Sequence, residues 1–154
     1  MMNVAYVLGR ILVPIVFIWE AIQRLLDIGS FAKLLADNNV PVPDDVSTYL
    51  GSMPKYEALA WLLAIIELVC GLMILLGLKA RWGAVVLVVF SAFTIFFIHH
   101  FWDMTGDAYV INQIQALKNL SILGALLLIA AIGSGPHSLP ARYPDIDNQS
   151  PERL

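Results

Sequence analysis

Cysteine and charge are both scarce in this chain of 154 residues. Cys70 is the only cysteine, so the chain can form neither an internal disulfide nor a CxxC redox pair. Only 14% of the residues are charged, against about a quarter in soluble domains, and 59% are hydrophobic. No basic cluster points to nucleic acid as a partner. The composition indicates a membrane protein and excludes electron transfer by the chain's own thiols.

Four apolar segments each approach the roughly 20 residues with which a helix spans a bilayer. They predict an all-α membrane protein, an antiparallel up-down bundle of four transmembrane helices in one domain over residues 1–133. A polar tail, 134–154, follows the bundle. The first span lacks the basic region and cleavage site of a signal peptide, so we expect it to be retained. The predicted spans are residues 4–26, 58–78, 82–102 and 113–133.

The connections between these spans differ in length and charge. The first, residues 27–57, contains GSFAKLLADNN, whose apolar spacing predicts a short helix that VPVPDD ends. We expect this helix to lie at the membrane interface; an ordinary surface helix is the alternative. The turn KARW and the C-terminal tail carry Lys and Arg, whereas DMTGDAYVIN carries only aspartate. Because cytoplasmic loops favour Lys and Arg, we expect both termini to be cytoplasmic.

Several charged residues lie inside the predicted spans, where a charge costs roughly 2.5–3.5 kcal/mol at the bilayer centre. Such residues normally face the bundle interior and find partners. The helical rise places Arg10 and Glu67 close enough in depth to pair, with Lys118 as the other candidate partner of Glu67. The remaining polar groups lie toward the outer ends of their helices. They are Glu20, His99, His100, Lys118 and Asn119.

These groups predict a polar pocket in the outer half of the bundle, with Glu67 at its floor. The candidate catalytic residues are Glu67, Lys118 and His100. Each has a structural alternative: a paired carboxylate that fixes helix register, a lysine that snorkels outward, or an interfacial histidine. The candidate ligand-binding residues are Arg10, Glu20, His99 and Asn119.

No metal site is predicted from the motifs. His99 and Asp103 have the spacing of two ligands on one helical face. A di-iron bundle, however, needs a Glu-x-x-His motif on each of two helices, and the sequence contains none. A metal at His99 and Asp103, or a haem ligated by His99 or His100, therefore stays a weak alternative.

The order and spacing of several motifs from about residue 9 to 133 are distinctive. They are LGRILVPIVFIWEAIQRL, NNVPVP, ELVCGLMILLGLKARWGA, HHFW and QALKNLSILGALLLIAA. In this pattern the chain resembles the DoxX-like family of small bacterial membrane proteins, one branch of which is the small subunit of thiosulfate:quinone oxidoreductase. The resemblance implies a four-helix bundle in a bacterial cytoplasmic (inner) membrane. Positions that match the family pattern are Arg10, Glu67, His100, Lys118 and Asn119.

Two classes of function follow. In the first, the chain is a membrane subunit of an oxidoreductase system that binds a quinone-like or other small apolar ligand in the outer pocket. The sequence has no motif for flavin, iron–sulfur or nicotinamide, so electrons would have to arrive from a redox partner subunit. In the second, the chain is a non-catalytic membrane scaffold whose ion pairs lock the helices. Transport is a third alternative; it would require a homo-oligomer, and the apolar inner half argues against a pore.

Overall fold

The computed structural model describes residues 2–43 and 53–135, and every regular element in these ranges is a helix. Four segments are long and apolar enough to cross a membrane, which confirms the predicted fold class. Most of the predicted tail, 134–154, lies outside the described residues. The membrane-length segments are α1 (Met2–Leu26), α4 (Lys55–Leu76), Ala80–Asp103, which begins with α5 (Ala80–Phe93), and α6 (Gly106–Ile132).

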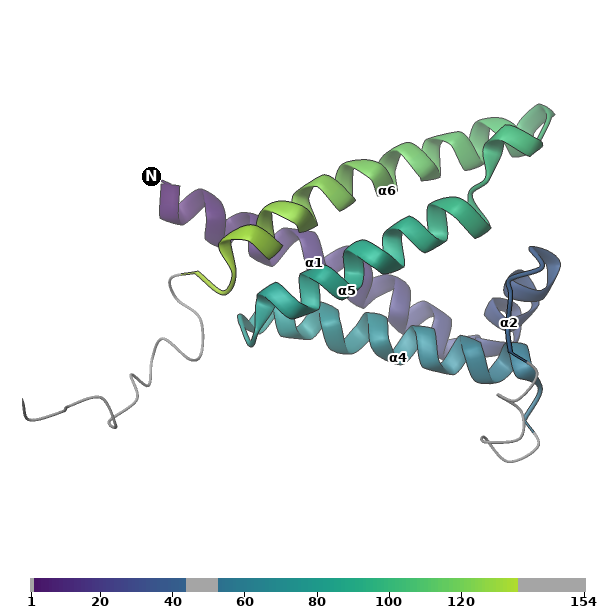
Figure 1. Cartoon of the computed structure of the whole chain (residues 1–154), viewed down its shortest axis with the longest axis horizontal. Coiled ribbons are helices and arrows are strands. Elements are labelled where there is room, and N and C mark those ends of the chain that lie inside the picture. The colour runs from purple at the N-terminus through teal and green to yellow at the C-terminus, as the bar shows by residue number, and fades with distance from the viewer. Residues whose placement is uncertain (1, 44–52, 136–154) are drawn as a thin grey trace, which may run out of the picture.

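The long helices pack in chain order (Figure 1). α1 lies along α4, α4 along α5, and α5 along α6, each antiparallel to the one before. α1 and α6 approach each other at the end that holds the N-terminus. They diverge toward the opposite end, where α2 (Ile28–Asp37) lies, and which we call the α2 end. The order is that of an up-down arrangement, with α1 and α6 in contact over a short stretch only.

The short helix predicted in the first connection is α2. Asp27 caps it by accepting a hydrogen bond from the Ser30 N–H at 3.1 Å. The hydrogen bonds from Ser30 lower the pKa of Asp27, so this cap is charged at neutral pH and is lost only as the pH falls through that lowered pKa. Phe31 and Leu35 bury the apolar face of α2 against α4 and η1. Its position at a membrane interface stays a prediction.

The third span is not one continuous α-helix. α5 ends at Phe93 and is followed by the π-helix η1 (Thr94–Ile98) and the 3₁₀-helix η2 (Phe101–Asp103). The π winding is closed by the His99 N–H, which donates to the Thr94 carbonyl five residues earlier at 2.9 Å. The prediction that His99 and Asp103 share a helical face is therefore wrong. π-turns inside helices occur frequently at functional sites.

The fourth span begins earlier than predicted. α6 starts at Gly106, seven residues before Gln113, and continues to Ile132. Thr105 is extended and precedes the helix, and Asp107 lies in its first turn, where the helix dipole favours an acidic side chain. The aspartate-containing stretch predicted to be a loop is thus mostly helix.

Two glycines allow the helices to pack closely. A Cβ atom on Gly71 of α4 would lie 2.9 Å from Cγ1 of Ile18 on α1. A Cβ atom on Gly83 of α5 would lie 3.0 Å from the carbonyl oxygen of Cys70 on α4. Ile18 is β-branched and stiff in a helix, and the Cys70 oxygen belongs to the backbone, so neither contact can move aside easily. These glycines set the distances between α1 and α4 and between α4 and α5.

We expect Gly71→Ala and Gly83→Ala each to destabilise the protein by about 1–3 kcal/mol, through overpacking of these helix contacts. Gly124→Ala is the matched control, because a Cβ there meets no atom within 4 Å and alanine favours a helix. Thermal unfolding in mild detergent measures all three. Equal stability of the three variants would show that the close contacts do not limit packing.

Candidate functional site

A chain of four charged side chains connects α6, α1 and α4. Glu67 of α4 is fully buried and forms an ion pair with Arg24 of α1. Arg24 also binds Glu20, with 3.1 Å between Nη2 and Oε2. Glu20 in turn lies 3.5 Å from Lys118 Nζ of α6, measured from its Oε1 atom. Two cations and two anions alternate along this chain, so its formal charge sums to zero.

The predicted partner of Glu67 is wrong. Glu67 pairs with Arg24, and not with Arg10 or Lys118. Arg10 is fourteen residues before Arg24, about 21 Å along the helix axis, so the two arginines cannot reach the same carboxylate. Helical side chains point back toward the N-terminus, which lets Arg24 reach from the end of α1 into the bundle.

Arg24 is held from several sides. Its guanidinium carbon lies 4.8 Å from the ring centroid of Phe31 and 5.5 Å from that of Phe90, within the range of cation–π contact. Glu20 and Glu67 bind its nitrogen atoms. The Oε1 atom of Glu67 is buried and has no hydrogen-bond partner within the described part of the chain. The guanidinium therefore has a fixed position inside an otherwise apolar layer.

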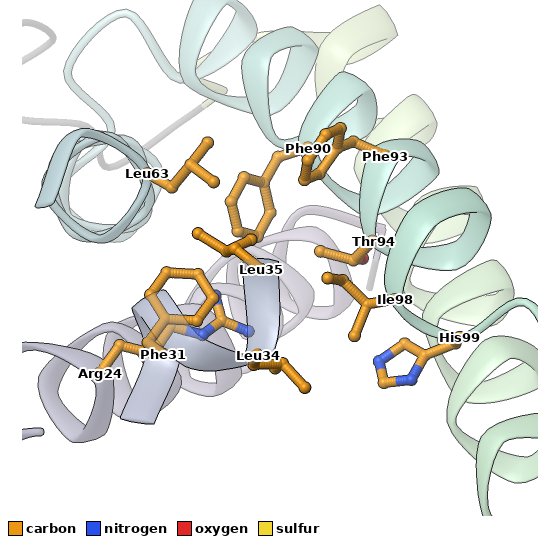
Figure 2. Close-up of a pocket in the computed structure, with 10 residues that line it drawn as sticks. All are labelled: Arg24, Phe31, Leu34, Leu35, Leu63, Phe90, Phe93, Thr94, Ile98 and His99. Atoms are coloured by element: carbon orange, nitrogen blue, oxygen red, sulfur yellow. The ribbon is translucent and has the colours of Figure 1, made fainter. Parts of the chain in front are cut away.

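A cavity of about 70 Å³ lies beside this guanidinium, between α1, α2, α4, α5 and η1 (Figure 2). Its wall is apolar and aromatic except for Arg24, Thr94 and His99. Arg24, and not the predicted floor residue Glu67, is among the described residues that line it. The other lining residues are Phe31, Leu34, Leu35, Leu63, Phe90, Phe93 and Ile98.

The polar groups of the cavity wall are oriented by neighbours. Thr94 donates to the Ser91 carbonyl at 2.9 Å and accepts from Asn119 Nδ2 at 3.4 Å. His99 Nδ1 lies 3.0 Å from the amide oxygen of Asn112, whose Nδ2 donates to a backbone carbonyl of its own helix. With that amide orientation His99 Nδ1 is the donor, so in the neutral ring Nε2 carries the lone pair and can accept a proton.

The structure brings five of the seven predicted site residues together. Glu20, Glu67 and Lys118 belong to the charged chain, His99 lines the cavity, and Asn119 binds the cavity residue Thr94. Their predicted catalytic and ligand-binding roles stay predictions.

His100 turns away from this group: its Nδ1 lies 3.1 Å from the Phe97 carbonyl, and its ring lies edge-on to Trp102. The sequence reasoning missed Arg24 and Thr94. Arg24 shares a helical stripe with Arg10 and Glu20, and this stripe was the signal that could have found it.

Arg10 lies at the opposite end of the molecule, where it binds the end of α6. Its Nη1 donates to the Ser134 carbonyl at 2.5 Å. Tyr6 donates to the Gly133 carbonyl, and Arg81 donates to the Ala131 carbonyl at 3.1 Å. Carbonyls at the end of a helix and just beyond it lack intrahelical donors and favour cations, so these contacts anchor the end of α6 to α1 and α5. Arg10 is far from the cavity, so the structure does not bring it together with the other predicted site residues.

Metal ligands do not cluster in the described ranges, 2–43 and 53–135. No group of three or more His, Cys, Asp or Glu side chains there is arranged to hold a metal ion.

Comparison with known proteins identifies the family. The model of the DoxX family matches residues 5–100, well over half of the chain. The chain belongs to the DoxX family. All ten residues that line the cavity fall inside the matched range, whereas Lys118 and Asn119 fall outside it.

Two relatives cover nearly the whole chain. Inner membrane protein YphA of Escherichia coli (strain K12) is 32% identical over 140 residues, which is 90% of each chain. Inner membrane protein YqjF of the same organism is 28% identical over 137 residues, 89% of this chain and 90% of the relative. No solved structure matches the chain.

We expect Arg24→Ala to destabilise the protein by about 3–5 kcal/mol, because Glu67 would stay buried without its cation. The double variant Arg24→Met/Glu67→Met removes both charges and should recover much of this loss. Thermal unfolding in detergent compares the two. Lys118→Ala is the control, since its bridge to Glu20 is partly exposed and should contribute less. A double variant no more stable than the single one would contradict the buried-pair explanation.

Proposed function

We propose that this DoxX-family protein is the membrane subunit of an oxidoreductase system and binds the ring of a quinone-like ligand beside Arg24. The observation that carries this proposal is a partly buried guanidinium in the wall of an aromatic and aliphatic cavity, with His99 in the same wall. Ligand sites of this kind combine an apolar lining with a few placed polar groups. A neutral ring with carbonyl oxygens suits one cationic donor surrounded by apolar side chains.

The polar groups also suit the protons of quinone chemistry. Reduction of a quinone to its hydroquinone takes up two electrons and two protons. Arg24 can donate a hydrogen bond to one carbonyl oxygen. His99 Nε2 can accept a proton from a hydroquinone hydroxyl or, once it is protonated, release one to a quinone oxygen. The sequence has no motif for a flavin, iron–sulfur or nicotinamide group, so the electrons come from a partner subunit. The candidate site residues Lys118 and Asn119 do not line the cavity in this proposal. They act on it indirectly, Lys118 through Glu20 and Asn119 through Thr94.

The helices and the relatives support a membrane location for the protein. Four segments are long enough to span a bilayer, and the two relatives are named as inner membrane proteins. We place this chain in a bacterial cytoplasmic membrane. Lys79 precedes α5 and Arg81 lies in its first turn, at the same end as the N-terminus. By the preference of cytoplasmic loops for basic residues, both termini are cytoplasmic, and the cavity lies in the outer half of the membrane.

A non-catalytic scaffold is the second candidate, and the charged chain favours it. Glu67, Arg24, Glu20 and Lys118 neutralise one another and tie three helices together, which a purely structural subunit also needs.

Binding of duroquinone, a tetramethyl benzoquinone without a tail, distinguishes the two candidates. We expect His99→Leu to weaken its binding about tenfold, the effect of losing one hydrogen bond of about 1.4 kcal/mol. Thermal unfolding should show that the variant stays folded. Equilibrium binding in detergent is the measurement, and Phe96→Leu, an exposed position on the π-helix that His99 follows, is the matched control.

Two results would contradict the oxidoreductase proposal. One is folded wild-type protein that binds no duroquinone. The other is equal binding by the wild type and His99→Leu. Either result would favour the scaffold.

A further inference from the structure

A second hollow adjoins the cavity at the α2 end. It measures about 360 Å³, is widely open, and lies between the end of α1 and the start of α2. We call it the vestibule. Three of its lining residues, Arg24, Phe31 and Leu34, also line the cavity. These three side chains therefore form the partition between cavity and vestibule. The remaining vestibule residues are all polar: Gln23, Asp27 and Ser30.

The size of the cavity limits what it can hold with the partition closed. At about 70 Å³ it has roughly half the 150 Å³ of an engineered protein cavity that binds benzene. A single six-membered ring is therefore too large for the closed cavity. The ring fits once the cavity and the vestibule join.

The three partition residues differ in how firmly they are held. Arg24 is bound by two carboxylates, Glu20 and Glu67. Phe31 and Leu34 belong to the ten-residue helix α2 and form no ion pair or hydrogen bond with the charged chain; Phe31 packs in an apolar cluster and against the Arg24 guanidinium, and Leu34 is 43% exposed. Figure 2 shows these two side chains on the same side of the cavity as Arg24. Movement of Phe31 and Leu34 opens the partition without breaking the charged chain.

We propose that the ligand reaches its site through the vestibule and binds next to Arg24, in the joined volume of cavity and vestibule that opens when Phe31 and Leu34 move. This inference rests on the proposed function and adds the route and the ligand class. Glu20 and Lys118, which bridge the diverging α1 and α6, are not among the described residues that line either hollow. The open vestibule, with polar and apolar side chains in its wall, thus admits a small ring without a long tail from the membrane surface, and the α1–α6 side is not the route.

Blocking the vestibule by chemical labelling tests the route. Gln23→Cys places a thiol on an exposed vestibule position, and the only native cysteine, Cys70, is buried. We expect a bulky methanethiosulfonate label on this variant to slow duroquinone association several-fold in stopped-flow fluorescence. Ser121→Cys is the matched control, because Ser121 is exposed on α6, near Lys118. Its label should leave association unchanged.

A second variant keeps the test independent of labelling. Leu34→Ala shortens a partition residue that is already partly exposed, so we expect faster duroquinone association than in the wild type. Slower association after labelling Ser121→Cys, with no effect at Gln23→Cys, would overturn the vestibule route in favour of access between α1 and α6. Absence of duroquinone binding in every unlabelled protein would instead refute the proposed function itself.

Discussion

The fold depends on one ion pair, between Arg24 and the fully buried Glu67. A carboxylate inside a membrane bundle is tolerated only with a partner, so α1 and α4 must pack in the register that brings these two side chains together. The close approach of Gly71 to Ile18 fixes the distance between the same two helices one turn away. The pair and the glycine thus determine where the guanidinium lies, and the cavity forms around it.

Charge balance explains which ligands suit the site. Arg24 is shared between two carboxylates, and Lys118 balances the second of them, so the charged chain is neutral as a whole. An ionic ligand would introduce a net charge into a layer whose other walls are hydrocarbon, at the cost of desolvation. A neutral ring with polar oxygens needs only hydrogen bonds. A structural scaffold requires the same balance of charge. The cavity, and not the charged side chains, therefore distinguishes the oxidoreductase proposal from the scaffold proposal.

The sequence predicted the four spans, the short helix after the first, and a polar layer that contains Glu20 and Lys118. The length of an apolar segment and the free-energy cost of a charge inside the bilayer determine these features directly. It did not predict the partner of Glu67. Counting residues gives the depth of a Cα atom, but a long arginine side chain spans more than a helical turn, so Arg24 at the predicted boundary reaches deeper than its position suggests. It also missed the start of α6 at Gly106, because Thr105, Gly106 and Asp107 are residues typical of a loop.

The π-helix was the feature least accessible from sequence, and two of its residues and its C-cap His99 line the cavity. In an α-helix, residues five apart point about 140° away from each other, since each residue turns the helix by about 100°. His99 would then face away from the cavity residue Thr94. The hydrogen bond from the His99 N–H to the Thr94 carbonyl closes a wider turn that stacks the two residues, and both line the cavity. A π-turn of five residues is too short for hydrophobic periodicity to reveal. His99, the side chain best suited to proton transfer, therefore reaches the cavity through a local deviation from the regular helix.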